Sequence, residues 1–195
     1  MFDLKETRPT GSDRNTLVDI DNSNGFFCAI RNVDGHSYEY TMKDDDCIQS
    51  YDFDYELSEE EMEEHNLNCE RTNTLRDYYL YLWGLPMKLK DDGTIIAKKV
   101  ESIIFNVSET LSVRVTYEPS IGSDTWYFYF DPDNYGLVGY RFYHNEADND
   151  GEYITLTEIH ETGSLRFPRK RKWFMNKDDN VLGEDILENV RIFKL

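Results

Sequence analysis

The chain has 195 residues, enough for one domain with a sizeable core. It carries 39 acidic and 21 basic residues, a net charge of -18, so nucleic acid and anionic membrane surfaces are poor candidates for partners. No window approaches the roughly 18 consecutive apolar residues of a membrane helix, and the first residues lack the pattern of a signal peptide. We therefore expect a single domain over residues 1–195 with no transmembrane segment.

The front of the chain contains four short runs in which apolar and polar residues alternate, separated by turn-rich segments. They cover residues 2–7, 15–21, 26–33 and 37–43. Alternation with period two is typical of strands, so we predict an antiparallel meander. A first strand that starts at Phe2 would lie at an exposed sheet edge, which favours pairing with another chain. We therefore expect a homodimer formed through that edge.

The segment from Asp44 to Glu64 carries eleven acidic residues and no basic one. A solvated loop and helix face explains this composition. A divalent-cation site is the alternative, but tight oxygen-ligand loops use a glycine to turn, and this segment has none. We favour the solvated surface and expect neither a metal nor another cofactor.

The three cysteines, Cys28, Cys47 and Cys69, form no CxxC pair, and no histidine lies at zinc-ligand spacing. Buried free thiols are the favoured interpretation. If the protein is exported, one disulfide is the alternative. Cys47 and Cys69 are then the favoured pair, because they bracket the acidic segment while Cys28 lies inside a predicted strand.

Two helices are predicted after the meander. Ser58 and Glu61 form the Ser-x-x-Glu capping box of a helix start, so a short helix is expected over about 58–67. A second helix is expected over about 74–83. Apolar or amphipathic side chains surround this second helix, which indicates burial in the core; a plug over the mouth of a cavity is the alternative.

From about Lys99 onward the alternating pattern returns in seven further runs, which gives about eleven strands for the whole chain. The strands are consecutive and linked by hairpins, and the helix pair interrupts them once. Such spacing predicts a mainly β fold, either a curved antiparallel sheet or an incomplete β-barrel.

The hairpin "WYFYFDPDNYGLVGYRFY" has bulky aromatic residues on both sides of a turn. Successive strand residues point to opposite faces, so Trp126, Phe128 and Phe130 point one way and Tyr127 and Tyr129 the other. Both faces therefore need a cover, and a lined apolar hollow would supply one.

Four segments carry a resemblance to a known family: "RDYYLYLWGLPMKLKDDGT", "VTYEPSIGSDTWYFYFDPDNYGLVGYRFYH", "DGEYITL" and "PRKRKWFMNKDDNVLGED". Together they resemble an uncharacterised family of bacterial envelope proteins related in fold to the lipoprotein carrier LolA. In LolA-like proteins an incomplete antiparallel barrel wraps a hydrophobic cavity, helices lie across its opening, and acyl chains bind inside. No LolA functional residue can be placed here by a matching motif, so the fold transfers better than the function.

The resemblance implies a non-enzymatic binding or carrier protein for a lipid or acyl chain in the periplasm or cell envelope. Such proteins usually carry an export signal and a leading helix, so we expect the front of the natural protein to be missing from this sequence. A structural interaction module, with its hollow filled by its own side chains, is a further alternative.

We predict one apolar pocket for the hydrophobic ligand, lined from the helix end and from one face of the aromatic hairpin. The tyrosine face of the hairpin is not chosen, since buried phenol hydroxyls need partners. A bulge near Gly136 would decide whether Leu137 or Val138 joins the pocket face with Tyr140 and Phe142. The predicted lining residues are Trp83, Leu85, Met87, Trp126, Phe128 and Phe130.

The segment "RFPRKRKW" is the one basic cluster, and on a strand it places Arg169 and Arg171 on one face. Charge balance against nearby acids is the favoured interpretation. The alternative is that the two arginines grip an anionic head group at the rim of the cavity.

An enzyme would need a nucleophile or an acid–base pair, and none of the four histidines has one at a motif-like spacing. We therefore name no catalytic residue. The enzyme alternative is a hydrolase that uses Glu152 and Glu158 beside His144 or His160. The acidic run 146–151 imitates the start of a calcium loop, but Thr157 stands where a bidentate Glu is required, so a hairpin turn is expected.

Overall fold

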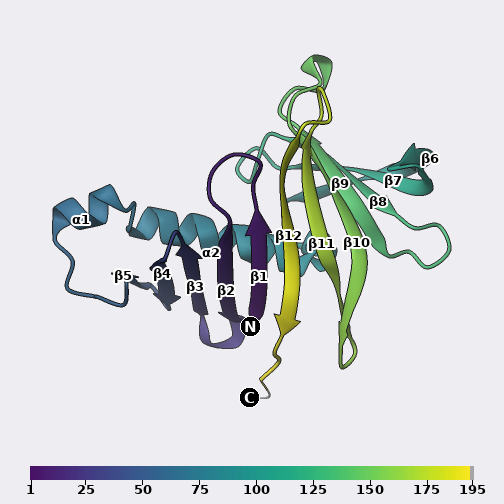
Figure 1. Cartoon of the computed structure of the whole chain (residues 1–195). Helices are drawn as coiled ribbons and strands as arrows, with labels where there is room; N and C mark the ends of the chain where they lie inside the picture. The colour runs from purple at the N-terminus through teal and green to yellow at the C-terminus, as the bar shows by residue number, and fades with distance from the viewer. Residues whose placement is uncertain (194–195) are drawn as a thin grey trace. The chain divides into compact units, whose positions relative to one another are not determined.

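The computed structural model describes residues 1–193, which are mainly β, with twelve strands and two α-helices. Contacts divide the chain into two compact units, and each is described by itself (Figure 1). One domain over residues 1–195 stays a prediction. Unit 1 comprises Met1–Gly84, Glu161–Phe167 and the chain from Asp185 onward, and unit 2 comprises Leu85–His160 and Pro168–Glu184.

The strands are β1 (Phe2–Thr7), β2 (Arg14–Asp21), β3 (Phe26–Val33), β4 (His36–Lys43), β5 (Asp46–Tyr51), β6 (Thr94–Phe105), β7 (Ser108–Tyr117), β8 (Thr125–Phe130), β9 (Leu137–Tyr143), β10 (Glu152–Thr162), β11 (Leu165–Met175) and β12 (Val181–Val190). They are hydrogen-bonded in the order β5-β4-β3-β2-β1-β12-β11-β10-β9-β8-β7-β6. Among the described residues this sheet has β5 and β6 as its edges, so it is not closed. The unclosed antiparallel sheet predicted from the sequence is confirmed.

The predicted edge at strand one is wrong. β1 lies between β2 and β12, so its backbone is paired on both sides. The last strand of the chain returns to the first one, and local alternation cannot reveal a pairing over such a sequence distance. An exposed edge that favours dimerisation must therefore be sought at β5 or β6.

In unit 1 the meander forms with the predicted strand limits to within a few residues. Val18 pairs with Ala29, and Ala29 pairs with Tyr40, so these side chains share one face. Together with Leu4 and Phe27 they are buried. Helix α2 (Cys69–Gly84) covers this face at β3, β4 and β5 (Figure 1).

Strand β5 was not predicted, because it lies inside the acidic segment and shows no alternation of apolar with polar residues. The face of β5 toward α2 includes Gln49, whose amide donates to the Thr72 hydroxyl at 2.9 Å. The opposite face includes the exposed Ile48. The pairing of β5 with β4 therefore decides its structure, and its own apolar pattern does not.

Helix α1 (Glu59–Glu64) begins at the predicted capping box. The Ser58 hydroxyl accepts from the Glu61 amide, and the Glu61 carboxylate accepts from the Ser58 amide. Helix α2 begins five residues earlier than the predicted start at Thr74. One face of α2 is buried while Tyr78 is exposed, so the helix is a core helix on one side only. Its buried residues are Thr72, Leu75, Tyr79, Leu82 and Trp83.

A disulfide joins Cys47 of β5 to Cys69 at the start of α2. The favoured interpretation of three free thiols is therefore wrong, and the pair named as the alternative is correct. Cys28 is a free, half-buried thiol. Burial raises the pKa of Cys28 to about 11, so it is a poor nucleophile.

Unit 2 contains β6 to β9 as consecutive antiparallel hairpins. The turn between β8 and β9 is held by Asp131, whose carboxylate accepts from the amides of Asp133 and Asn134. The acidic run 146–151 forms the short 3-10 turn Glu146–Asp148 between β9 and β10, as expected for a hairpin. Within the described residues, no helix is both long and apolar enough to cross a membrane.

Candidate functional site

The aromatic hairpin of unit 2 presents the face on which the predicted pocket depends. Trp126 pairs with Phe142 and Phe128 with Tyr140, so the four rings lie on one face. A register shift follows Tyr129, after which Phe130 pairs with Leu137 and Val138 is the extra residue. Tyr140 and Phe142 thus join the Trp126 face, which settles the register that the sequence left open.

The rings on the Trp126 face contact one another. The Trp126 ring centroid lies 4.9 Å from that of Phe142 and 6.0 Å from that of Phe128. Phe128 has no exposed surface and Tyr140 is also buried, whereas Trp126 and Phe142 are only half-buried. The face is therefore packed at its centre and accessible beside it.

The same face continues across β7 onto β6, where apolar side chains become exposed. Val113 pairs with Phe128 on one side and with Val100 on the other. On this face of β6, Ile96, which pairs with Val115, and Val100 are exposed by 49% and 52%, while Ser102, hydrogen-bonded to Glu109, separates Val100 from Ile104. Unit 2 thus has a continuous apolar face that its own strands do not cover at the β6 end.

The opposite face of the hairpin is also covered by its own residues. Tyr127 donates its hydroxyl hydrogen bond to Glu146 at 2.6 Å, in the polar setting predicted for it. Tyr129 is instead buried under Phe105, with ring centroids 4.0 Å apart, which corrects the expectation of a polar environment for this tyrosine. Burial raises the pKa of Tyr129 to about 12.

Gly139 explains how this second aromatic layer fits. A Cβ at Gly139 would lie 2.3 Å from the Phe105 ring and 2.6 Å from the Ile154 carbonyl oxygen, closer than real Cβ atoms come. Only glycine leaves room for the Phe105 ring above Tyr129. Close packing against Phe105 and the Ile154 carbonyl thus accounts for glycine at this position.

The three remaining predicted lining residues lie at the end of α2 and just after it. Trp83 belongs to unit 1, where it is buried and stacks on Phe2 with centroids 4.3 Å apart. Leu85 and Met87 belong to unit 2, where Leu85 is half-buried and Met87 is exposed by 61%. The structure groups Trp126, Phe128 and Phe130 on one strand face, and the joint pocket with Trp83 stays a prediction.

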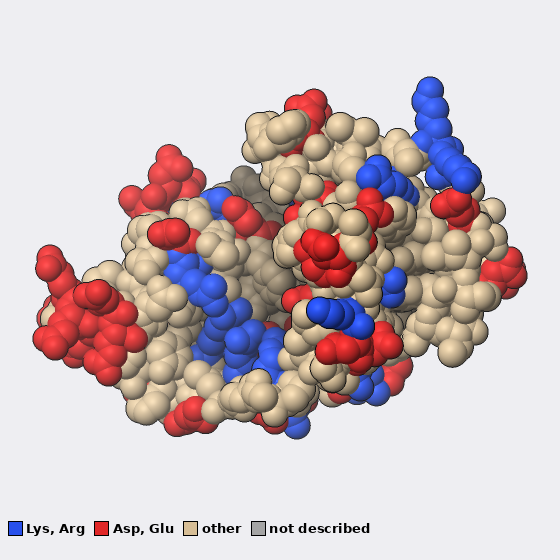
Figure 2. Space-filling view, turned by 90° about the horizontal axis from the view of Figure 1, so that it is seen from above, with Lys and Arg blue, Asp and Glu red and all other residues tan. Residues whose placement is uncertain are grey.

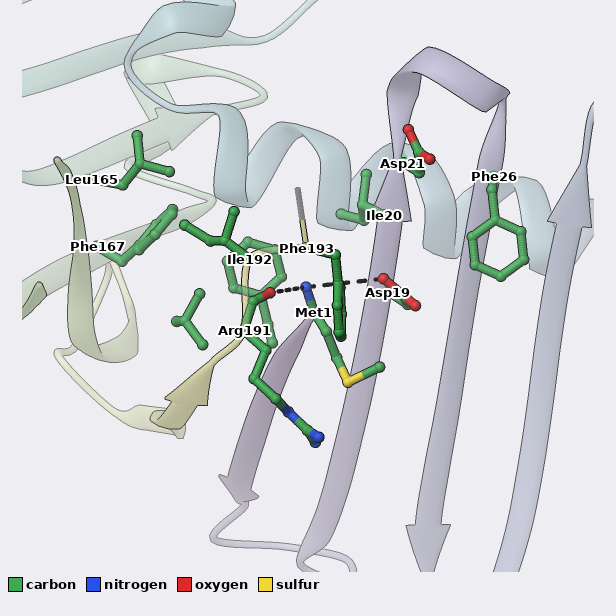
Figure 3. A pocket seen from close by; sticks show the side chains of 12 residues that line it. Met1, Asp19, Ile20, Asp21, Phe26, Leu165, Phe167, Arg191, Ile192 and Phe193 are labelled. Carbon is green, nitrogen blue, oxygen red and sulfur yellow. Dashed lines mark hydrogen bonds and ion pairs between the residues drawn. The ribbon is translucent and has the colours of Figure 1, made fainter. Parts of the chain in front are cut away.

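Unit 1 has a pocket of about 330 Å³ beside this stack (Figure 3). Phe167 lies edge-on to both Phe2 and Trp83, so Trp83 lies behind the aromatic wall of the pocket. The sequence did not predict this pocket, because β1, β11 and the end of the chain meet only through sheet pairing. Its apolar lining is Met1, Phe2, Ile20, Phe26, Leu165, Phe167, Val190, Ile192 and Phe193.

The predicted rim arginines differ in their surroundings. Arg169 forms an ion pair with Glu158 at 3.1 Å, and Lys170 joins the same carboxylate, so both balance charge as favoured from the sequence. Arg171 is buried. A role for Arg169 and Arg171 at the rim of a cavity stays a prediction.

The candidate hydrolase residues His144, Glu152 and Glu158 make different contacts, and the charge of His144 acts on Glu152. His144 is hydrogen-bonded through Nδ1 to Asp124 at 2.8 Å, and this contact raises the pKa of the imidazole. Glu158 pairs with Arg169 and Lys170. Glu152 is half-buried, and burial raises the pKa of its carboxyl group.

A buried ionic cluster in unit 1 was missed by the sequence analysis. Glu6 on β1 accepts two hydrogen bonds from Arg14, at 2.5 and 2.8 Å, and another from Thr16. Arg8 forms an ion pair with Asp185 at 3.0 Å. The strand register pairs Glu6 with Arg14, and knowledge of that pairing would have indicated the cluster. From the sequence alone, a glutamate in an alternating strand is expected to face solvent.

The fold resembles solved structures across nearly the whole chain. A LolA superfamily protein from Nitrosomonas europaea has a TM-score of 0.56 at 9% identity, over 99% of this chain and 84% of that one. A domain assigned to outer membrane lipoprotein sorting from Vibrio parahaemolyticus has a TM-score of 0.53 at 8% identity, over 97% and 83%. A DUF1329 family protein from Desulfovibrio piger ATCC 29098 has a TM-score of 0.52 at 8% identity, over 96% and 81%.

At such low identity these likenesses show the fold alone, and that fold is LolA-like, as the sequence resemblance implied. The profile of a family of unknown function, DUF6503, matches residues 4–189. No curated protein matches the chain.

Proposed function

We propose that this chain, which belongs to the family of unknown function DUF6503, is a non-enzymatic binding or carrier protein for a hydrophobic ligand, a lipid or an acyl chain. The observation that carries the proposal is the apolar face of unit 2, which runs from the half-buried Trp126 and Phe142 rings across Val115 of β7 to the exposed Ile96 of β6. A contiguous apolar surface of this kind marks an interaction site.

The energy available on such a face is sufficient for an acyl ligand. Each buried methylene contributes about 0.8 kcal/mol, so a chain of about ten carbons gains several kcal/mol even after part is lost to immobilisation. The pocket of unit 1 offers a second apolar surface, and its volume of about 330 Å³ lies within the usual range for small-molecule sites.

We place the protein in the periplasm or cell envelope. Two of the solved structures with the same fold are a LolA superfamily protein and a lipoprotein-sorting domain, and we carry the envelope location over from them. The disulfide between Cys47 and Cys69 supports this location, because disulfides persist in oxidising compartments and are rare in the cytosol.

The first test is native mass spectrometry of freshly purified protein, followed by titration with a fluorescent fatty acid. We expect co-purified lipid or saturable dye binding. Trp126→Ala should weaken dye binding, because it removes one of the two partly accessible rings, Trp126 and Phe142, on this face. Tyr127→Ala is the matched control, since it removes an aromatic side chain from the opposite face of the same strand.

Phe128→Ala gives the complementary result. Because Phe128 is fully buried, its truncation should lower the free energy of unfolding by about 3–5 kcal/mol in a urea titration. A stability loss of that size at both Trp126 and Phe128, with no binding of any hydrophobe, would favour a filled structural module. Reproducible turnover of an ester or glycan that is lost in His144→Ala or Glu152→Gln would favour the hydrolase alternative.

A further inference from the structure

Unit 1 gathers four arginines on the α2 side of its strands. Arg8 follows β1, Arg14 lies on β2, Arg31 on β3 and Arg71 on α2. We call these four residues the arginine row. Figure 2 shows basic side chains gathered in a band on the part of the surface formed by β1–β5 and α2, between acidic groups. In a chain with a net charge of -18, such a concentration of cations runs against the overall composition.

In unit 1, ion pairs with carboxylates are formed by two of the four arginines in the row, Arg8 and Arg14. Glu6 is held by Arg14 through two hydrogen bonds, and Asp185 is held by Arg8. Within residues 1–193, neither Arg31 nor Arg71 forms an ion pair. The charge of Arg31 lies near enough to Glu6 to help lower the pKa of that carboxyl group, but among the described residues no carboxylate is in ion-pair contact with Arg31 or Arg71.

Arg31 is the less satisfied of these two. Its residue is only 8% exposed, and one of its terminal nitrogens donates to the Tyr79 hydroxyl at 3.1 Å. Its Nε–H is fully buried and has no acceptor among the described residues. A buried donor of a charged group without an acceptor destabilises the folded state, and an acceptor placed there would recover that loss.

Arg31 and Arg71 both act on the hydroxyl group of the buried Tyr40. Burial raises the pKa of Tyr40, and the nearby charges of Arg31 and Arg71 oppose that rise. The surroundings are apolar, since Phe27, Leu75 and the Tyr79 ring are all buried on this side of the strands. The row thus ends in two cations and a hydroxyl that lie beside an apolar interior.

We propose that Arg31 and Arg71 bind the anionic head group, a carboxylate or a phosphate, of an amphiphilic ligand. Guanidinium groups match the planar, bidentate geometry of carboxylate and phosphate oxygens, and their charge-assisted hydrogen bonds are stronger in a partly desolvated setting. The inference rests on the proposed function for the hydrophobic part of the ligand and adds the chemistry of its head.

The test compares ligands that share a tail and differ in the head. A neutral fluorescent hydrophobe bound to the full chain is displaced by dodecanoate, dodecyl phosphate or dodecanol. We expect the two anions to displace it at concentrations about tenfold lower than dodecanol does, the factor for one charged hydrogen bond. In Arg31→Met this preference should disappear while dodecanol displaces as before.

Arg76→Met is the control, since it removes the same charge from a half-buried position of α2 whose ion pair, among the described residues, is with Asp77. It should keep the preference for anions. Equal displacement by all three ligands in the unmodified protein overturns the proposal and needs no variant, so a folding defect in Arg31→Met cannot hide the answer. A preference for anions that survives in Arg31→Met also overturns it.

A last arm separates this inference from the proposed function. Inorganic phosphate alone is added, and the melting temperature is recorded. Suppose that no hydrophobe binds but phosphate raises the melting temperature of the unmodified protein and not of Arg31→Met. The arginines then bind a free anion, and the proposed carrier function is wrong. If hydrophobes bind without regard to their head group, the carrier function stands and the arginine site fails.

Discussion

At the scale of single residues, the most constrained ionisable group is Glu6. Burial opposes its charge, but hydrogen bonds from Arg14 and Thr16 outweigh that cost, and the pKa of Glu6 lies below its ordinary value of 4.5. A carboxyl group whose pKa is depressed on folding contributes stability above its unfolded pKa, and that stability is lost as the pH falls toward its folded pKa. Glu6 should therefore make the fold sensitive to acid below about pH 4.5.

Replacement of Glu6 by Gln tests this dependence. We expect Glu6→Gln to lose about 3–5 kcal/mol of unfolding free energy at pH 7, because it leaves the guanidinium of Arg14 without its counter-ion. Below pH 4.5 the difference from the unmodified protein should shrink. Urea titrations from pH 3 to pH 7 measure it, with the exposed Glu188→Gln as control. An equal loss at every pH would contradict the assignment.

At the scale of elements, the disulfide ties β5 to the start of α2 across 22 residues of sequence. These residues include most of the acidic segment and also α1, which has no buried residue of its own. An element with so little buried surface has little packing to hold it, so the covalent link limits its freedom in the unfolded chain.

Reduction should therefore destabilise unit 1. We expect Cys47→Ser, or dithiothreitol added to the unmodified protein, to lower the free energy of unfolding by about 2–4 kcal/mol. Cys28→Ser is the control, because Cys28 is the free thiol and its variant should keep the response to reductant. Identical urea midpoints with and without reductant would show that the link contributes nothing.

At the scale of the whole molecule, the strand order leaves β6 as a long edge with exposed apolar residues. The β6 sequence is complementary to itself: in an antiparallel pairing of two copies centred on Val100, Lys99 faces Glu101 and Ile96 faces Ile104. Such an edge favours association with a second copy. The bulge between Ile96 and Val100 bends the strand, so we predict weak, concentration-dependent self-association.

A charge exchange tests this register. Glu101→Lys should abolish association measured by sedimentation, because it places like charges opposite each other twice, and the double variant Lys99→Glu with Glu101→Lys should restore it. Lys98→Glu is the control, since Lys98 faces Ser102 in the same pairing. A protein that remains monomeric at every concentration would contradict the prediction.

Local patterns in the sequence determined most of the strands, the hairpin turn and the start of α1. The predicted runs at residues 2–7 and 26–33 match β1 and β3 in full, because alternation with period two needs only neighbouring residues. The capping box at Ser58 is likewise a matter of four residues. The assignment of Trp126 and Phe128 to one face follows from the same local rule.

Tertiary structure decided what depends on partners far away in the chain. β12 covers β1, so Phe2 is not at an edge, and Phe105 covers Tyr129, so that tyrosine is buried. Glu6 reads as a surface residue until pairing brings Arg14 and Thr16 to it. Alternation tells which residues share a face, but only the pairing of distant strands decides what lies against that face and whether it meets water.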